Sequence, residues 1–176
     1  AMRRQRNRRP DLQSAFQNKV ADYIAVKKKQ GNEDTFMEMV IDFPGGARVD
    51  AHFGPYTVAT DQPPQGGGQG LAPTPFATFL ASFGTCAGIY VLGFCRQRGI
   101  PAEGIKLVQR LEVNPTNGMI SKILLDIQLP PDFPERYKTA VIRAADQCAV
   151  KKHFENPPQF AINTSTVAES TAVPVM

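Results

Sequence analysis

A run of 20 residues without a charged side chain, residues 76–95, restricts the fold of this chain more than any other feature. The residues at its two ends are typical of helix termini. Thr74 can cap the first turn, Pro75 suits the first helical position, and Arg96 to Gly99 supply basic side chains and a glycine stop. We therefore predict one long helix between Thr74 and Gly99, with all of its faces covered by apolar surroundings.

Either a lipid bilayer or a protein core can cover such a helix. The run is long enough to cross a bilayer, and Gly84-Thr85-Cys86-Ala87-Gly88 has the glycine spacing of closely packed membrane helices. However, the run is rich in Ala, Ser, Thr and Gly, the mean hydropathy of the chain is −0.25, and amphipathic segments flank the run. We predict a buried helix outside any membrane, packed against another helix or its symmetry mate.

Alternating apolar and polar residues predict strands on both sides of the helix. Residues 35–60 read as three short strands joined by tight turns, and Arg48 follows the first turn. Its side chain either lies at a sheet edge without a functional role or directs its guanidinium toward a group that needs a cation. Residues 105–113 and 123–129 read as a long antiparallel hairpin around a turn at residues 115–118.

A second helix is predicted to open at Pro134 and to end before Pro157, and residues 160–166 can form a last strand. Strands, a helix, a hairpin, a helix and a strand in this order describe an α+β domain. We expect this domain to span residues 32–176. Ahead of it we expect a basic disordered tail over residues 1–10 and an amphipathic helical extension over residues 11–31.

The basic character of the chain is confined to its first residues. The formal net charge is +4, but five arginines lie in the first nine positions, and the rest carries 15 basic and 16 acidic side chains. We therefore expect no nucleic-acid partner. Residues 66–70 lack the strand and the Gly-Lys ending of a phosphate loop and read as a flexible connector. Two histidines and dispersed carboxylates predict no metal site, and we expect no cofactor.

Three cysteines are too few for a secreted disulfide framework, and their odd number does not fit one either. With no apolar segment behind the basic start, we expect a reducing cytoplasmic setting. Cys86 and Cys95 are nine residues apart, which places them about 180° apart around a helix, so they cannot pair. Cys148 lies on the apolar stripe of the second helix and can meet only one of them. A cysteine on such a stripe is more often an inert core residue than a nucleophile.

The setting of two of these cysteines resembles a known family. Cys86 lies in Ser82-Phe83-Gly84-Thr85-Cys86-Ala87-Gly88, and Cys148 lies in Ala145-Asp146-Gln147-Cys148-Ala149-Val150-Lys151-Lys152. Together with the order of strands and helices, this pair resembles the OsmC/Ohr family of cysteine-dependent peroxidases over residues 36–164.

The resemblance implies an α+β, OsmC-like fold in which antiparallel sheets pack around long buried helices in an intertwined homodimer. It implies that Cys86 attacks an organic hydroperoxide and becomes a sulfenic acid, that Cys148 resolves it as a disulfide, and that a dithiol reductant restores both thiols. A thiol in the middle of a helix needs a nearby cation to ionise, and the family often carries an activating arginine in the turn where Arg48 lies.

Two positions depart from the family pattern. Phe76 stands where the family has a glutamate that orients the arginine, and Cys148-Ala149 stands where it has Cys-Pro. Phe76 favours an apolar pocket, suited to fatty or aromatic hydroperoxides. It also leaves open an alternative function, a non-enzymatic homodimer that binds an apolar small molecule in its interface cleft.

Overall fold

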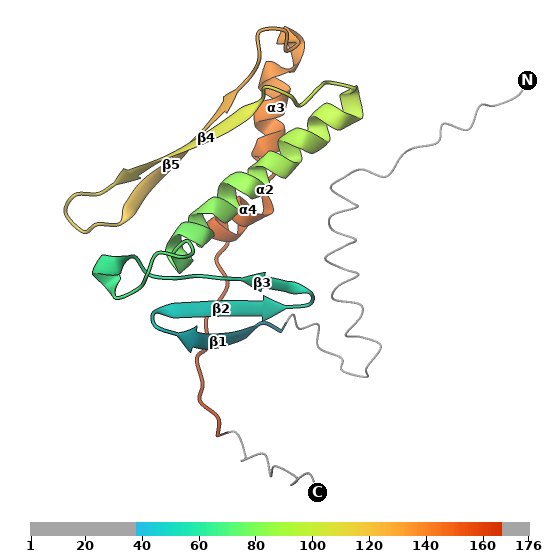
Figure 1. Ribbon diagram of the computed structural model, residues 1–176. Coiled ribbons are helices and arrows are strands. Elements are labelled where there is room, and N and C mark those ends of the chain that lie inside the picture. The colour runs from blue at the N-terminus through green and yellow to red at the C-terminus, as the bar shows by residue number, and fades with distance from the viewer. Residues whose placement is uncertain (1–37, 167–176) are drawn as a thin grey trace, which may run out of the picture.

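The computed structural model of the chain describes residues 38–166. These residues form an α+β arrangement of two antiparallel sheets and three α-helices (Figure 1). In chain order the elements are β1 (Val40–Gly45), β2 (Arg48–Phe53), β3 (Tyr56–Val58), η1 (Pro64–Gly66), α2 (Pro75–Arg98), β4 (Lys106–Val113), β5 (Ile120–Gln128), η2 (Glu135–Tyr137), α3 (Lys138–Ala145) and α4 (Ala149–Glu155).

Helix α2 begins and ends at the predicted residues. The Thr74 hydroxyl accepts a hydrogen bond from the Ala77 backbone N–H at 3.2 Å, and Pro75 occupies the first helical position. Gly99 adopts a left-handed conformation with φ of 65°, and its N–H bonds to the carbonyls of Cys95 and Arg96. A glycine is suited to this position because a Cβ would be strained there.

The core lies between the C-terminal half of α2, the helices α3 and α4, and the hairpin β4–β5. Buried apolar residues come from α2 and from the segment that begins at Phe133. They are Ala87, Val91, Phe94, Cys95, Phe133, Val141, Ala145 and Cys148. The N-terminal half of α2 is not covered in this way, since Phe76 is 58% exposed and Phe79 is 45% exposed. One chain therefore leaves this half exposed, and its burial against a symmetry mate stays a prediction.

By length and composition alone, α2 is also a candidate membrane span, with a mean hydropathy of 1.6 over its most apolar window. Only 28% of that window is buried inside the structure. The residues that are buried pack against α3, α4 and β4, as they would in the core helix of an ordinary domain. The remainder of the window is an exposed apolar surface, of the kind that marks an interaction site.

The predicted antiparallel hairpin is confirmed as β4–β5, with its second strand beginning at Ile120. Leu107 pairs with Ile127 and Leu111 pairs with Ile123, so the apolar side chains share one face. Gln109 interrupts this face and reaches α2, where its side-chain amide donates to the Leu80 carbonyl at 3.1 Å. Gly84 makes this approach possible, because a Cβ there would lie 2.9 Å from the Gln109 side-chain oxygen.

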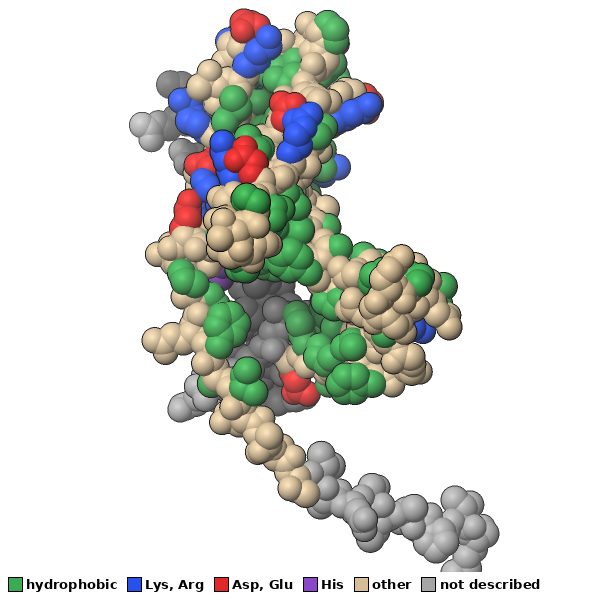
Figure 2. All heavy atoms as spheres, turned by 90° about the vertical axis from the view of Figure 1, so that its left-hand side faces the viewer, with side chains coloured by type: hydrophobic (Ala, Val, Ile, Leu, Met, Phe, Trp, Pro, Cys, Tyr) green, Lys and Arg blue, Asp and Glu red, His purple; other side chains and the backbone are tan. Residues whose placement is uncertain are grey.

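The second sheet has the order β1-β2-β3 and lies beyond the N-terminal end of α2 (Figure 1). Strand β1 is exposed on both of its faces, although it carries large apolar side chains. Figure 2 shows hydrophobic side chains and few charged ones on the lower half of the face that it presents. The exposed apolar residues of this sheet and its approach are Met39, Val40, Ile41, Phe43 and Tyr56.

The segment after Pro134 differs from the prediction of one continuous helix. It opens with the short 3-10 helix η2, continues as α3, and breaks at residues 146–148 before α4 begins. The last turn of α3 tightens to i→i−3 bonds, since the N–H groups of Gln147 and Cys148 reach the carbonyls of Ala144 and Ala145. The expected last strand is also wrong, because residues 160–166 are extended without a strand partner among the described residues.

Three of the sequence predictions lie outside the described residues. They are the basic tail over residues 1–10, the helical extension over residues 11–31, and the first residues of the predicted first strand.

The glycine-rich segment before α2 is a defined turn organised by a buried carboxylate, where a flexible connector was expected. Asp61 is 2% exposed and accepts hydrogen bonds from the backbone N–H groups of Gln62, Gln69 and Leu71 at 2.8, 3.1 and 3.0 Å. The Leu71 bond is the largest of the effects that lower the pKa of Asp61, and burial opposes it. The turn around this carboxylate leads the chain from β3 to the start of α2.

Replacing Gly68 should damage this turn. A Cβ at residue 68 would lie 1.9 Å from the Gln62 carbonyl oxygen and 2.6 Å from an Asp61 carboxylate oxygen, and a backbone oxygen cannot move aside. We expect Gly68→Ala to lower the free energy of unfolding by about 1–3 kcal/mol or more, measured by thermal and urea denaturation. Gly66→Ala is the control, because its nearest neighbour would be the Gln62 Cβ at 3.3 Å. Equal stability of the two variants would contradict this account of the turn.

Candidate functional site

The structure brings Cys86 and Cys148 together and leaves all three cysteines free of disulfide bonds. Cys86 lies in the middle of α2, half-buried, and packs against the core. Cys148 belongs to that core and is fully buried at the junction of α3 and α4. Two thiols from distant parts of the chain therefore meet where one is accessible and the other is not.

The break between α3 and α4 determines where Cys148 lies. Cys148 is the residue before the first turn of α4 and has φ of −49° and ψ of 123°, outside the helical range. Its sulfur lies 3.8 Å from the Phe83 carbonyl oxygen on α2, within range for a weak S–H donor. This contact attaches the start of α4 to α2 three residues before Cys86.

Burial is the main reason why the pKa of Cys148 is raised above its ordinary value. The backbone N–H groups of Lys151 and Val150 oppose this effect, whereas hydrogen bonding and charge repulsion from the Cys86 side chain add to it. Cys148 is therefore held as a neutral thiol at neutral pH, in direct interaction with Cys86.

Cys95 lies apart from this pair, as the nine-residue spacing predicted. It is fully buried in the core, and burial raises its pKa, with a smaller opposing effect from the charge of Arg98. A buried, protonated thiol without a sulfur partner among the described residues behaves as a small apolar side chain.

Three phenylalanine rings form an exposed cluster at the N-terminal end of α2. The rings of Phe76 and Phe79 stack with centroids 5.8 Å apart, and Phe79 meets Phe154 of α4 edge to face at 5.2 Å. Phe79 lies two helical turns before Cys86, and Phe154 lies on the helix that begins after Cys148. An apolar surface is thus built from the same two helices that carry the thiols. The sequence pointed to Phe76 alone.

Tyr90 is a second residue near the thiols that the sequence did not single out. It follows Cys86 by one helical turn on α2. Burial is the main cause of its raised pKa, and both Cys86 and Cys148 contribute to the rise. The i, i+4 spacing from a candidate nucleophile was the available signal, but an isolated tyrosine on an apolar helix is usually a packing residue.

Arg48 stands at the start of β2, the central strand of its sheet, and pairs with a buried carboxylate. Its guanidinium lies 2.5 Å from an oxygen of Asp50, which is 4% exposed, and the other carboxylate oxygen accepts the Thr60 backbone N–H at 3.3 Å. Within residues 38–166 of one chain, Arg48 makes no hydrogen bond to either cysteine. Asp50 fixes the arginine in a way that the sequence did not reveal.

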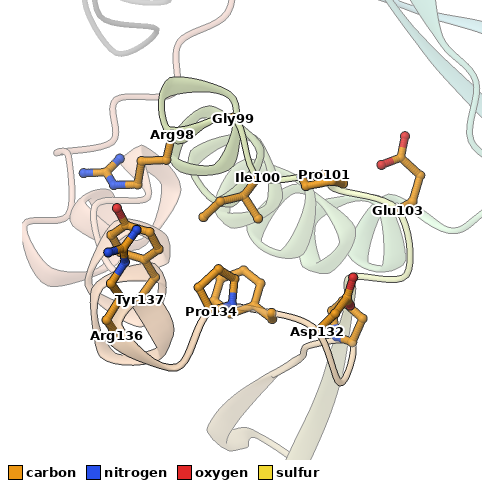
Figure 3. A pocket seen from close by; sticks show the side chains of 11 residues that line it. Arg98, Gly99, Ile100, Pro101, Glu103, Asp132, Pro134, Arg136 and Tyr137 are labelled. Atoms are coloured by element: carbon orange, nitrogen blue, oxygen red, sulfur yellow. The ribbon is translucent and has the colours of Figure 1, made fainter.

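A cavity of about 220 Å³ lies at the other end of α2 (Figure 3). Ile100, Pro101 and Pro134 line its apolar part, with Arg98, Arg136 and Tyr137 to one side and Glu103 and Asp132 to the other. The charge of Arg98 lies 3.8 Å from the centre of the Phe94 ring, and Arg136 lies 4.8 Å from that of Tyr137. No cysteine lines the cavity, and residues 38–166 hold no cluster of metal-binding side chains.

The described residues thus form an α+β protein of two antiparallel sheets and a long capped helix, with two free thiols near the middle of that helix. The chain matches the family model of the OsmC-like proteins over residues 66–163, which is more than half of its length. It therefore belongs to the OsmC-like protein family, as the residues around Cys86 and Cys148 predicted.

Solved structures of other proteins share this fold at low sequence identity. A Psychrobacter arcticus protein provisionally described as an osmotic stress induced and detoxification response protein is 18% identical, with a TM-score of 0.58 over 69% of this chain and 90% of that one. An OsmC-like protein from Mycoplasma pneumoniae is 14% identical, with a TM-score of 0.52 over 70% of this chain and 90% of that one.

A third structure, from Legionella pneumophila, is named an organic hydroperoxide resistance protein OsmC. It is 17% identical over 69% of this chain and 91% of that one, and its TM-score of 0.42 is too low for its name to bear on this chain. A search of curated proteins found no match. The likeness to solved structures thus concerns the fold alone.

Proposed function

We propose that this OsmC-like protein is a thiol peroxidase that reduces organic hydroperoxides through Cys86 and Cys148. The observation that carries the proposal is the direct interaction of a half-buried thiol with a fully buried one. A hydroperoxide can approach Cys86, whereas Cys148 is within reach of Cys86 but not of solvent. This difference in access supports the order in which the two thiols would act.

The chemistry divides into two steps. The Cys86 thiolate attacks one peroxide oxygen, the O–O bond breaks, and a sulfenic acid and an alcohol form once the leaving alkoxide takes up a proton. The Cys148 thiol then attacks the Cys86 sulfur, a disulfide forms, and the sulfenic hydroxyl leaves with the thiol proton as water. A dithiol reductant returns both cysteines to thiols by disulfide exchange.

The aromatic cluster supports an apolar organic substrate. Phe76, Phe79 and Phe154 expose 58%, 45% and 45% of their surfaces beside the helices that carry the thiols. Contact with the hydrocarbon part of a fatty or aromatic hydroperoxide would remove this surface from water. Hydrogen peroxide has no hydrocarbon part and would gain nothing from the cluster.

The same cluster supports a second candidate, a non-enzymatic protein that binds an apolar small molecule. The observation that favours it is Phe76, which replaces the carboxylate that orients the arginine in family peroxidases. If the thiols do not react with peroxides, the three phenylalanine rings would still bind a hydrocarbon ligand. Peroxide turnover separates the two functions.

We also propose a homodimer in which a second copy covers the surfaces that one chain leaves open. Strand β1 exposes Val40, Ile41 and Phe43 by 55, 51 and 79%. A three-stranded sheet with such a strand gains stability by packing on another surface. The exposed half of α2 is an apolar surface of the required kind, and cover by β1 over part of it would leave the aromatic cluster as one wall of a cleft at the interface. A dimer that covers both surfaces would also explain how α2 can have the hydropathy of a membrane helix outside a lipid bilayer.

The first prediction concerns turnover. Parent protein treated with cumene hydroperoxide should consume peroxide and form one intramolecular disulfide between Cys86 and Cys148, detected by intact mass and peptide mapping. Cys86→Ser should abolish consumption, because the attacking sulfur is gone. Cys148→Ser should allow one turnover and then stop at the sulfenic acid.

Cys95→Ala is the matched control for these variants, since Cys95 is equally buried but remote from the pair. Its turnover should equal that of the parent. Loss of turnover in Cys95→Ala, or retained turnover in Cys86→Ser, would contradict the mechanism. A parent protein that does not consume peroxide, but whose melting temperature rises with an apolar ligand, would favour the non-enzymatic binding of an apolar small molecule.

The second prediction concerns Arg48, which we propose activates Cys86, with Asp50 as its carboxylate partner in place of the family glutamate. Arg48→Met should shift the pH dependence of Cys86 alkylation by iodoacetamide upward, measured with the other two cysteines replaced. One pKa unit corresponds to about 1.4 kcal/mol. Arg48→Lys should recover part of the effect, since a point charge places its donors differently from a planar guanidinium.

Arg110→Met provides the control for charge alone, because Arg110 is an exposed arginine that pairs with Asp126 on the hairpin at 3.7 Å. Its alkylation profile should match that of the parent. If Arg48→Met also overlays the parent between about pH 5 and pH 10, then Arg48 has no part in activation.

The third prediction concerns assembly. At low micromolar concentration, sedimentation velocity should give about twice the monomer mass of 19.3 kDa without detergent. Phe43→Lys should shift the protein toward monomer, because it places a charge on the exposed face of β1, whereas Thr116→Lys in the hairpin turn should not. A monomeric parent, or one that requires detergent, would be evidence against the dimer.

A further inference from the structure

Tyr90 lies close to the thiols through the geometry of its helix. It follows Cys86 by four residues on α2, so the two side chains share one face. Long side chains in a helix lean toward its N-terminus, which carries the Tyr90 ring over the turn that holds Cys86. Cys148 reaches the same part of α2 through the Phe83 carbonyl.

The phenol of Tyr90 lies near enough to both sulfurs for them to affect its pKa, and it has no hydrogen-bond partner among the described residues. Burial is the largest cause of its raised pKa, followed by Cys86 and then Cys148. Among residues 38–166 it makes no hydrogen bond, and it is half-buried. At neutral pH the phenol therefore keeps its proton, and no residue of the described chain accepts it.

The first step of a thiol peroxidase needs a proton at this place. When the Cys86 sulfur bonds to one peroxide oxygen, the electron pair of the broken O–O bond remains on the other oxygen as an alkoxide. An alkoxide is a stronger base than a phenolate, so a phenol transfers its proton to it readily. The proton has to arrive as the bond breaks, which favours a donor already in place beside the sulfur.

We propose that Tyr90 is a catalytic residue that donates its phenolic proton to the leaving alkoxide when Cys86 cleaves a hydroperoxide. The inference rests on the proposed peroxidase function and extends it to the proton donor. The S–O bond forms, the O–O bond breaks, the alkoxide leaves as the alcohol, and the tyrosinate recovers its proton from water. Cys86 is oxidised to the sulfenic acid, and the peroxide is reduced.

The basicity of the leaving group tests this assignment. Reaction with tert-butyl hydroperoxide expels a strongly basic alkoxide, whereas reaction with peracetic acid expels acetate, which needs no proton at neutral pH. The chain contains no tryptophan to report by fluorescence, so sulfenic acid formation is followed by quenched flow and intact mass. A Cys148→Ser background stops the reaction at that stage.

In this background, Tyr90→Phe should slow the reaction with tert-butyl hydroperoxide by about 10²-fold, within the range of general acid catalysis. The rate with peracetic acid should stay within about twofold. Tyr137→Phe is the control, because Tyr137 packs on the Phe94 ring and lines the cavity at the other end of α2. Its rates with both oxidants should match those of the background.

Equal slowing of both oxidants by Tyr90→Phe would indicate a packing role, and no slowing would indicate no role. Either result overturns the assignment of Tyr90 and leaves the peroxidase in place. A background protein whose Cys86 reacts with neither oxidant would overturn the peroxidase itself, and the proton donor with it.

Discussion

The uncharged surface of α2 is the constraint on which the rest of the structure depends. Apolar surface left in water costs about 25 cal/mol per Å², so a helix of 24 residues with so few polar side chains has to be covered along its length. Helices α3 and α4 and the hairpin cover its C-terminal half, where Ala87, Val91 and Phe94 are buried. At its other end, the aromatic cluster and strand β1 leave apolar surface uncovered. In the proposed dimer, β1 of a second copy would cover part of this half of α2 and leave the aromatic cluster as one wall of a cleft.

The same packing produces the pair of thiols. Small side chains between Gly84 and Gly88 let neighbouring elements approach α2 closely, and the junction of α3 and α4 lies against it at the Phe83 carbonyl. Cys148 is buried there and protonated, whereas Cys86 keeps part of its surface. Two interacting thiols of equal exposure would have no preferred order of reaction. In the proposed peroxidase, unequal burial would set that order, because a bulky hydroperoxide could reach only the half-buried sulfur of Cys86.

The sequence predicted those parts of the molecule whose signals are local. The caps of α2 and the antiparallel hairpin β4–β5 each depend on a few neighbouring residues, and both are confirmed. The break before Cys148 was not predictable, because the apolar spacing continues through it and the burial of Cys148 against α2 appears only in the tertiary structure. The contact of Phe79 with Phe154 joins positions on two helices far apart in the chain, and no local pattern encodes it.

The pairing of Arg48 with Asp50 bears on how this arginine can act. Asp50 is buried, and its carboxylate is held by Arg48 and the Thr60 N–H, so charge and countercharge lie side by side. The field of such a pair falls off faster with distance than that of a free cation. Arg48 would therefore influence a thiol through a directed hydrogen bond from its remaining N–H groups and not through long-range attraction. In one chain no such bond reaches Cys86, so a second copy that seats its sheet on the exposed half of α2 would have to deliver it. In the proposed homodimer, the contact that covers the helix would then also be the one that activates the thiol.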